Sequence, residues 1–258
     1  MAMHLSQVAA QLYTVRDSCR TAADLAITAA RLRGIGYTAV QVSGIGPIPE
    51  AEVVRIMAGE GLVICATHEP ADRILHEPEA CIERLQALGC GLTAYPHPKG
   101  VNLGSREEVL GLIAALARAG ERFAAAGLRL GYHNHACEFV RFDDTTVLEA
   151  IFARTDPRHL VAELDTYWVQ YGGGDPVAWC EKLRGRLPFI HLKDYGFTAA
   201  NQPVFAEIGA GNLDWPRLIA AAERAGCEWF IVEQDVCPGD PFESLRRSFE
   251  HIRTHLVS

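Results

Sequence analysis

The sequence predicts an α/β fold in which parallel strands close into a single (β/α)8 TIM barrel, and three observations support this. Short apolar segments alternate with amphipathic segments at helical spacing eight times along the chain, which is typical of a parallel sheet. The length of 258 residues is close to that of one such barrel. No glycine-rich phosphate loop follows the first strand, which argues against an open doubly wound sheet. We therefore expect one barrel domain over residues 1–258.

The first half of the chain supplies four of the expected strand and helix pairs. The expected strands cover residues 8–16, 39–44, 62–68 and 92–97. The expected helices cover residues 24–33, 49–61, 77–89 and 105–127. Ser105 is a plausible N-cap for the last of these helices. Helices repeatedly end in glycine, as at Gly36 and Gly61, which suits the left-handed residue that follows a helix.

The second half supplies the other four pairs. The expected strands cover residues 128–135, 159–165, 188–194 and 229–235. The expected helices cover residues 146–155, 214–226 and 242–257, and a further one begins near Asp175–Pro176, a cap followed by proline in the first turn. A longer loop over residues 195–213 precedes the seventh helix.

Composition limits the classes of function. The chain is 49% hydrophobic and 22% charged, which is ordinary for a soluble globular protein. A net charge of −8 argues against nucleic-acid and anionic-membrane partners, because both attract basic surfaces. We expect neither a signal peptide nor a membrane span, because no basic and apolar leader pattern and no apolar stretch approaching about 18 residues is visible. Eight cysteines without a CxxC motif suit a reducing compartment, so a cytoplasmic location is expected.

The last four strands each end on histidine, glutamate or aspartate. Asp165 ends strand six, His191 lies near the end of strand seven, and Glu233 near the end of strand eight. The mouth of a barrel brings such strand ends together. Carboxylates and an imidazole suit one divalent ion such as Mn²⁺, Zn²⁺, Co²⁺ or Mg²⁺. Three protein ligands leave positions open for substrate or water.

Strand five offers several choices for a fourth ligand. His133 and His135 share one face of the strand, and Glu138 follows in the loop. A carboxylate is the commoner partner of a hard ion, which favours Glu138. His133 and His135 remain the alternatives.

Other polar and aromatic residues are expected at the barrel mouth. Lys193 shares a strand face with His191 and is expected to neutralise an enolate or carry a proton. His68 ends strand three and is a candidate acid or base as well as a substrate contact. The remaining expected substrate contacts are Gln11, Tyr13, Arg16, His133, Tyr167 and Glu207. The alternative for Arg16 is a surface role, and the alternative for Tyr167 is core packing.

Six short motifs resemble the xylose isomerase-like barrel superfamily of sugar isomerases and epimerases over essentially the whole chain. The motifs are QLYTVR, YHNHACEF, ELDTYW, HLKD, EIGAGNLDW and VEQD. The superfamily also includes inosose and dehydroshikimate dehydratases and endonuclease IV. The resemblance implies a Glu, Asp, His, Glu ligand set, of which Asp165, His191 and Glu233 match three. Strand five departs from that pattern, because His133 stands where the glutamate is usual, and the YHNH pattern looks more like the inosose dehydratase-like branch.

The expected activity is that of a metal-dependent sugar isomerase or epimerase acting on a carbohydrate, cyclitol or keto-sugar. A base removes the proton next to a carbonyl, and the metal stabilises the enediolate as a Lewis acid. Candidate bases are Glu233, His135 and Glu138. A dehydratase of the inosose dehydratase type is the alternative. An endonuclease IV-like phosphodiesterase and a non-catalytic binding barrel are less expected. A small-molecule partner is implied, and a homo-oligomer is compatible with the sequence.

Overall fold

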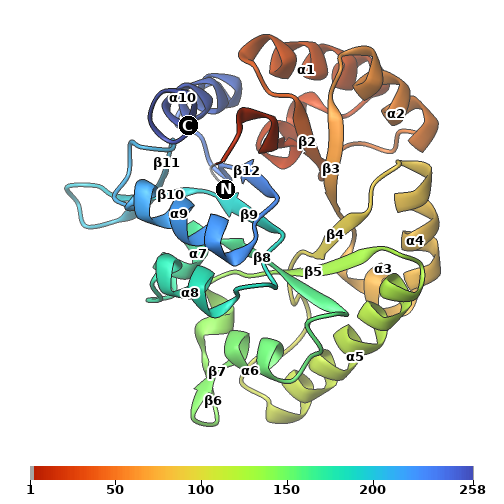
Figure 1. Cartoon of the computed structure of the whole chain (residues 1–258), viewed down its shortest axis with the longest axis vertical. Coiled ribbons are helices and arrows are strands. Elements are labelled where there is room, and N and C mark those ends of the chain that lie inside the picture. The colour runs from red at the N-terminus through yellow and green to blue at the C-terminus, as the bar shows by residue number, and fades with distance from the viewer. Residues whose placement is uncertain (1–2, 258) are drawn as a thin grey trace.

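The computed structural model describes residues 3–257 and confirms the predicted (β/α)8 barrel (Figure 1). The strands close in the order β1-β12-β9-β8-β5-β4-β3-β2, and the pairs between them are parallel. In chain order the barrel strands are β1 (Val8–Gln11), β2 (Ala39–Val42), β3 (Val63–His68), β4 (Leu92–Tyr95), β5 (Arg129–His133), β8 (Leu160–Asp165), β9 (Phe189–Leu192) and β12 (Trp229–Val232).

Helices surround the barrel on its outer side (Figure 1). They are α1 (Ala22–Ile35), α2 (Glu50–Gly59), α3 (Ala71–His76), α4 (Pro78–Ala87), α5 (Arg106–Ala125), α6 (Val147–Ala153), α7 (Thr166–Tyr171), α8 (Pro176–Lys182), α9 (Trp215–Ala225) and α10 (Pro241–His255). Short 3-10 turns are η1 (Leu5–Gln7), η2 (Leu12–Ser18) and η3 (Cys137–Phe139). Within residues 3–257, no helix combines the length and apolar character needed to cross a membrane.

The structure differs from the expected elements in three places. Strand one does not reach residue 16, because the chain turns into η2 where the Gln11 side chain accepts a hydrogen bond from Tyr13 N. The loop over residues 195–213 contains most of a hairpin made by β10 (Asp194–Phe197) and β11 (Pro203–Ala206). A second small hairpin, β6 (Arg141–Phe142) with β7 (Thr145–Thr146), follows η3.

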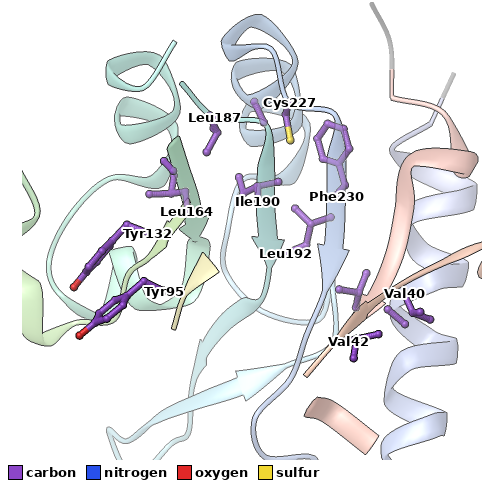
Figure 2. Packing of buried hydrophobic residues seen from close by; sticks show 14 of the residues in the cluster. Val40, Val42, Tyr95, Tyr132, Leu164, Leu187, Ile190, Leu192, Cys227 and Phe230 are labelled. Atoms are coloured by element: carbon purple, nitrogen blue, oxygen red, sulfur yellow. The ribbon is translucent and has the colours of Figure 1, made fainter. Parts of the chain in front are cut away.

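The main hydrophobic core lies between the barrel and its helices. Buried side chains such as Leu164, Ile190 and Phe230 belong to this cluster (Figure 2). Because side chains alternate along a strand, the neighbours of these residues point into the barrel. Leu164 outside therefore leaves Glu163 and Asp165 inside.

Inside the barrel, apolar side chains lie below polar ones. Phe189 and Ile231 belong to a small interior cluster, and the next inward residues along their strands are His191 and Glu233. Gly131 on β5 makes room for this layer, since a Cβ atom added there would lie 2.6 Å from the Phe189 ring. The sequence thus places a polar ring at the carboxyl-terminal mouth of the barrel.

Candidate metal centre

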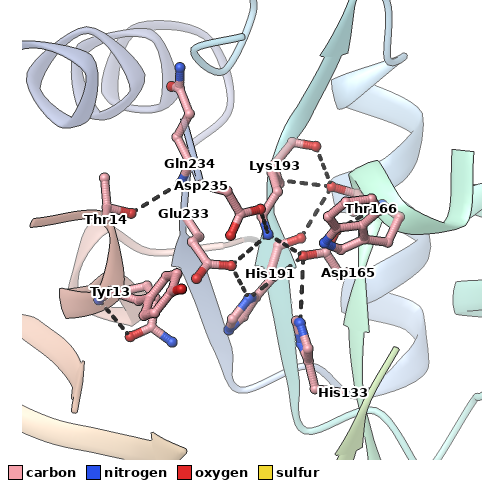
Figure 3. A network of polar contacts seen from close by, with 12 residues as sticks. Tyr13, Thr14, His133, Asp165, Thr166, His191, Lys193, Glu233, Gln234 and Asp235 are labelled. Atoms are coloured by element: carbon pink, nitrogen blue, oxygen red, sulfur yellow. Dashed lines mark hydrogen bonds and ion pairs between the residues drawn. The ribbon is translucent and has the colours of Figure 1, made fainter. Parts of the chain in front are cut away.

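His191 lies at the centre of a buried polar cluster at the barrel mouth (Figure 3). Its Nδ1 atom is 2.9 Å from Glu233 Oε2 and 3.8 Å from Asp165 Oδ2. His133 Nε2 lies 4.0 Å from the same Asp165 oxygen. One ligand atom from each of His133, Asp165, His191 and Glu233 falls within 4.8 Å of all the others. The structure thus brings together the three expected strand-end ligands and one histidine of strand five.

A second group of possible ligands overlaps the first. It contains His68, His133, Glu163 and His191. His133 faces Glu163 Oε2 through Nδ1 at 3.1 Å, and His191 faces Glu163 Oε1 through Nε2 at 3.1 Å. The two groups therefore use opposite nitrogens of the two shared imidazoles.

A chain of side-chain amides identifies the protonated nitrogen of His191. Tyr13 N donates to Gln11 Oε1 at 3.3 Å, and Gln11 Nε2 donates to Gln41 Oε1 at 2.8 Å. Gln41 Nε2 in turn donates to Glu163 Oε1 at 2.6 Å. A backbone amide only donates and a carboxylate only accepts, so both glutamine orientations are fixed. His191 Nε2, 2.6 Å from Gln41 Oε1, must then carry a proton, and Nδ1 faces the carboxylates of Asp165 and Glu233.

Lys193 forms a buried ionic cluster with three carboxylates. Its Nζ atom lies 2.9 Å from Asp165 Oδ2, 2.7 Å from Glu233 Oε2 and 2.8 Å from Asp235 Oδ2 (Figure 3). Burial lowers the pKa of Lys193, but the three carboxylates outweigh this and hold it well above its usual range. Lys193 is therefore a fixed positive charge beside two of the possible metal ligands.

The backbone around Asp165 positions its carboxylate. Asp165 caps α7, because its Oδ1 atom accepts from Trp168 N at 2.9 Å. Asn134 Oδ1 accepts from Asp165 N at 2.9 Å. The hydroxyl of Thr166 lies 3.1 Å from His191 O and 2.8 Å from Lys193 O, both of which accept from it at the end of β9. The Oδ2 atom of Asp165 is thereby left for the centre of the cluster.

The protonation states follow from burial and nearby charges. Burial lowers the pKa of His191, but ionised Glu163 and Glu233 outweigh it and raise the pKa to about 10. Burial raises the pKa of Asp165 to about 6, although Lys193 and His191 lower it. Burial raises the pKa of Glu233, yet Lys193 and His191 hold it well below its usual range. Burial lowers the pKa of His133 to about 3, so this ring is neutral.

A cleft of about 390 Å³ opens directly above the cluster. Of the residues that the sequence indicated, those lining it are Tyr13, His68, His133, His135 and Glu233. Burial lowers the pKa of His135, and the neighbouring His133 and Lys193 lower it further, so its ring is also neutral. The cleft is large enough for a small polar ligand.

Glu138 lies outside both groups of possible ligands. Its Oε1 atom accepts from the Tyr132 hydroxyl at 2.8 Å, and Oε2 accepts from His135 N at 2.8 Å. Both carboxylate oxygens are engaged beneath the strand-five loop, because η3 turns the side chain towards β5 instead of the cleft. His133 holds the place in the cluster that the sequence assigned to Glu138.

Four other expected substrate contacts do not line the cleft. Glu207 accepts from Ser244 Oγ at 2.9 Å and lies 3.3 Å from Arg247 Nη1, so it ties the loop to α10. Tyr167 stacks on Phe205 with ring centroids 4.0 Å apart. Arg16 lies over the Tyr13 ring, its guanidinium carbon 4.3 Å from the ring centroid. Gln11 is fully buried and belongs to the amide chain.

Two central residues were missed from the sequence, and period-two alternation would have found both. Glu163 lies two residues before Asp165 and therefore shares its inward face. Gln41 is the single polar residue of strand two, at an inward position. A polar residue at an inward position of a barrel strand is itself a signal, because the interior is otherwise apolar.

The donors of the first group fit a divalent ion. Among residues 3–257, the buried side-chain atoms without a hydrogen-bond partner include Asp165 Oδ2. Asp165 Oδ2 is in ionic contact with Lys193 but is not aligned as a hydrogen bond. Two imidazoles and two carboxylates form a donor set used by catalytic metal ions.

Comparisons with known proteins agree with this fold. The inosose dehydratase of Geobacillus thermodenitrificans is 29% identical over 159 residues, which are 55% of this chain and 53% of that protein. The match thus spans about half the length of that relative. A sugar phosphate isomerase/epimerase from Parabacteroides distasonis has the same fold, with a TM-score of 0.83, 22% identity and coverage of 100% of this chain and 97% of that one.

A third relative was crystallised with a metal ion. It is a xylose isomerase-like TIM barrel protein from Mycobacterium smegmatis in complex with magnesium, with a TM-score of 0.77 and 14% identity, covering 99% of this chain and 98% of that one. The family model described as xylose isomerase-like TIM barrel matches residues 29–255. The closed barrel has the fold that this family model describes, and the chain belongs to the xylose isomerase-like TIM barrel family.

Proposed function

We propose that this protein is a divalent-metal-dependent enzyme that removes a proton next to the carbonyl group of a sugar, keto-sugar or cyclitol. The direction of the His191 ring carries the proposal. Its Nδ1 atom faces Glu233 Oε2 at 2.9 Å and Asp165 Oδ2 at 3.8 Å, while Nε2 donates to Gln41. These three atoms converge on one point, where the Lys193 ammonium and a second proton on His191 balance the carboxylates in the metal-free protein, and where a divalent cation would take the place of that proton.

The residues that would hold this cation are His133, Asp165, His191 and Glu233. The amide chain favours this group over the one containing Glu163, because it turns the protonated nitrogen of His191 towards Glu163. Mixed nitrogen and oxygen donors suit Mn²⁺, Co²⁺ or Zn²⁺, and the magnesium complex of the mycobacterial relative adds Mg²⁺ to the ions worth testing. A bound divalent ion supplies Lewis acidity towards a carbonyl oxygen.

Side chains on the cleft wall supply the proton transfer. Glu163 Oε2 holds His68 at Nε2, so the Nδ1 atom of His68 is left to exchange a proton with substrate. His135 lines the same cleft as a neutral ring. The low pKa of Glu233 and the engaged oxygens of Glu138 argue against either carboxylate as the base. Lys193 keeps Glu233 ionised.

Two outcomes can follow the loss of the proton. Its return gives an isomerase or epimerase, which suits the sugar phosphate isomerase/epimerase neighbour. Expulsion of a neighbouring hydroxyl gives a dehydratase. Two observations favour this second candidate. Relatives that are 27–29% identical are inosose dehydratases, and strand five presents His133 where a two-carboxylate isomerase would need a glutamate.

A solvent-exchange experiment tests the proposal. The protein, loaded in turn with Mn²⁺, Co²⁺, Zn²⁺ and Mg²⁺, is incubated in D₂O with a panel of keto-sugars and inososes. Deuterium at the carbon next to the carbonyl, absent with Asp165→Ala, is expected for one substrate class. Loss of water from that substrate identifies a dehydratase, and an unchanged mass apart from deuterium identifies an isomerase or epimerase. No exchange with any substrate by metal-loaded protein would contradict the proposal.

A further inference from the structure

Glu163 is a fully buried carboxylate behind the cluster, and no step proposed above uses it as a ligand. Its Oε1 atom accepts from Gln41 Nε2 at 2.6 Å and lies 3.1 Å from His191 Nε2. Its Oε2 atom lies 3.1 Å from His133 Nδ1 and contacts His68 Nε2. Four nitrogen atoms thus surround the two oxygens, two in hydrogen bonds and two in contacts of 3.1 Å, which matches the roughly four lone-pair positions of a carboxylate.

The strand register accounts for this position. His133 and Glu163 are direct partners in the parallel pair of β5 and β8. Asp165 and His191 are direct partners in the next pair, β8 with β9. Glu163 therefore lies between the two strands that carry the imidazoles, one inward position deeper in the barrel than Asp165.

We propose that Glu163 is a shared positioning residue that fixes both histidine ligands with their lone pairs towards the metal centre. This inference rests on the metal-dependent function proposed above. An ionised carboxylate only accepts, so its neighbours His133 Nδ1 and His191 Nε2 carry the protons. The opposite atoms, His133 Nε2 and His191 Nδ1, are then the ones that can bind a metal, and they face Asp165 Oδ2 at 4.0 and 3.8 Å.

A single carboxylate behind two ligands also excludes an ion from the deeper group. A metal there would need unprotonated His133 Nδ1 and His191 Nε2. The chain of amide hydrogen bonds that begins at Tyr13 N runs in the direction that leaves His191 Nε2 protonated. Hydrogen bonds behind metal-bound histidines typically contribute about 10- to 100-fold in metal affinity. Here one residue contributes this for two ligands.

Glu163→Gln tests the inference sharply because an amide offers only one acceptor atom. Gln41 Nε2 needs that acceptor at the Oε1 position, so the new NH₂ group lies at the Oε2 position. It then donates to His133 Nδ1, and the His133 proton moves to Nε2, where the lone pair was needed. The reverse amide orientation does the same to His191.

The matched control is Glu138→Gln, which makes the same change at a second fully buried glutamate. Glu138 accepts hydrogen bonds from Tyr132 and from a backbone amide, and none of its hydrogen bonds comes from an imidazole ring. Both variants therefore lose a charge and a buried carboxylate, but only the residue replaced in Glu163→Gln contacts the histidine ligands.

Two readouts separate the inference from the proposed function. Long-range ¹H–¹⁵N spectra of the metal-free full chain report the tautomer of His133, assigned by its absence in His133→Asn. Competition with a chelator measures Co²⁺ affinity, and the visible spectrum of bound Co²⁺ reports its ligands. We expect wild-type His133 to be protonated at Nδ1. In Glu163→Gln we expect the tautomer to change and Co²⁺ binding to weaken about 10- to 100-fold with an altered spectrum. Glu138→Gln should show neither change.

Several results would overturn the inference. These are a wild-type His133 protonated at Nε2, an unchanged tautomer or unchanged Co²⁺ affinity in Glu163→Gln, or an equal loss of affinity in Glu138→Gln. If the tautomers behave as expected but the wild type binds no Co²⁺, Mn²⁺ or Zn²⁺, the metal-dependent function is wrong and the assigned proton positions stand.

Discussion

His191 directs its Nδ1 atom at Glu233 Oε2, 2.9 Å away, and both side chains are buried inside the barrel. Two acceptors cannot face each other at this distance without a positive charge between them. In the metal-free protein a second proton on His191 supplies it, because Glu163 and Glu233 overcome the effect of burial and raise the pKa of His191 to about 10. A divalent ion must displace that proton.

Metal affinity should therefore depend on pH in two stages. The pKa of Asp165 is raised to about 6 and that of His191 to about 10. Between these values Asp165 is ionised and His191 protonated, so binding releases about one proton and affinity rises about tenfold per pH unit. Below the pKa of Asp165 the rise should be steeper, because a second proton is displaced. Co²⁺ competition titrations between the two pKa values would measure this, and a pH-independent affinity would contradict it.

The same raised pKa gives the metal-free protein a pH-dependent stability. The folded pKa of His191, about 10, lies above its reference value of 6.5, so the folded state binds the proton more tightly. This stabilisation is fully present below the reference value and is lost as pH rises through the folded pKa. Urea unfolding of the metal-free protein should show stability falling over that alkaline range, and saturating metal should reduce the slope.

Removal of the Lys193 charge should destabilise the metal-free protein. Lys193→Met leaves Asp165, Glu233 and Asp235 facing one another without their shared cation. Breaking a buried ionic cluster in this way typically costs about 3–5 kcal/mol. Urea unfolding with and without Zn²⁺ would measure the loss, and added Zn²⁺ should restore part of it.

Lys182→Met is the control for this change. Lys182 pairs with Glu149 on the surface, and its side chain is 52% exposed, so solvent screens the pair and a change below about 1 kcal/mol is expected. Equal destabilisation by the two variants would show that the Lys193 cluster has no special role in the stability of the barrel.

The barrel interior should not tolerate a methyl group at Gly131. A Cβ atom there would lie 2.6 Å from the Phe189 ring, so Gly131→Ala should cost about 1–3 kcal/mol through overpacking. Phe189→Leu should remove the conflict, giving a coupling energy in a double-mutant cycle of unfolding. Gly91→Ala is the control, since a methyl group at that position would have no neighbouring atom within 4 Å. Additive effects of Gly131→Ala and Phe189→Leu would contradict the packing argument.

The sequence predicted the barrel and three of the four residues of the central cluster because these depend on local patterns. Short apolar strands between amphipathic helices are visible along the chain, and Asp165, His191 and Glu233 stand at strand ends. Glu138 was favoured over His133 because a carboxylate suits a hard ion, but this preference took no account of the η3 turn. That turn directs Glu138 to Tyr132.

The polar layer beneath the ligands depends on register between strands that are distant in sequence. Gln41 meets Glu163 across the barrel, from β2 to β8, and Gln11 meets Gln41 from β1. Each residue taken alone is one polar side chain in an apolar strand. Only closure of the barrel turns them into one chain of hydrogen bonds, so their common purpose could not be derived from the sequence.

Elemental analysis of the purified protein tests the central claim most directly, with Asp165→Ala and Asp235→Ala measured beside the wild type. Both variants lose a carboxylate that contacts Lys193, but only Asp165 belongs to the group around His191. We expect about one divalent ion per chain in the wild type and in Asp235→Ala, and none in Asp165→Ala. Metal-free wild type after incubation with Mn²⁺, Co²⁺ and Zn²⁺, or full metal content in Asp165→Ala, would contradict the proposed metal centre.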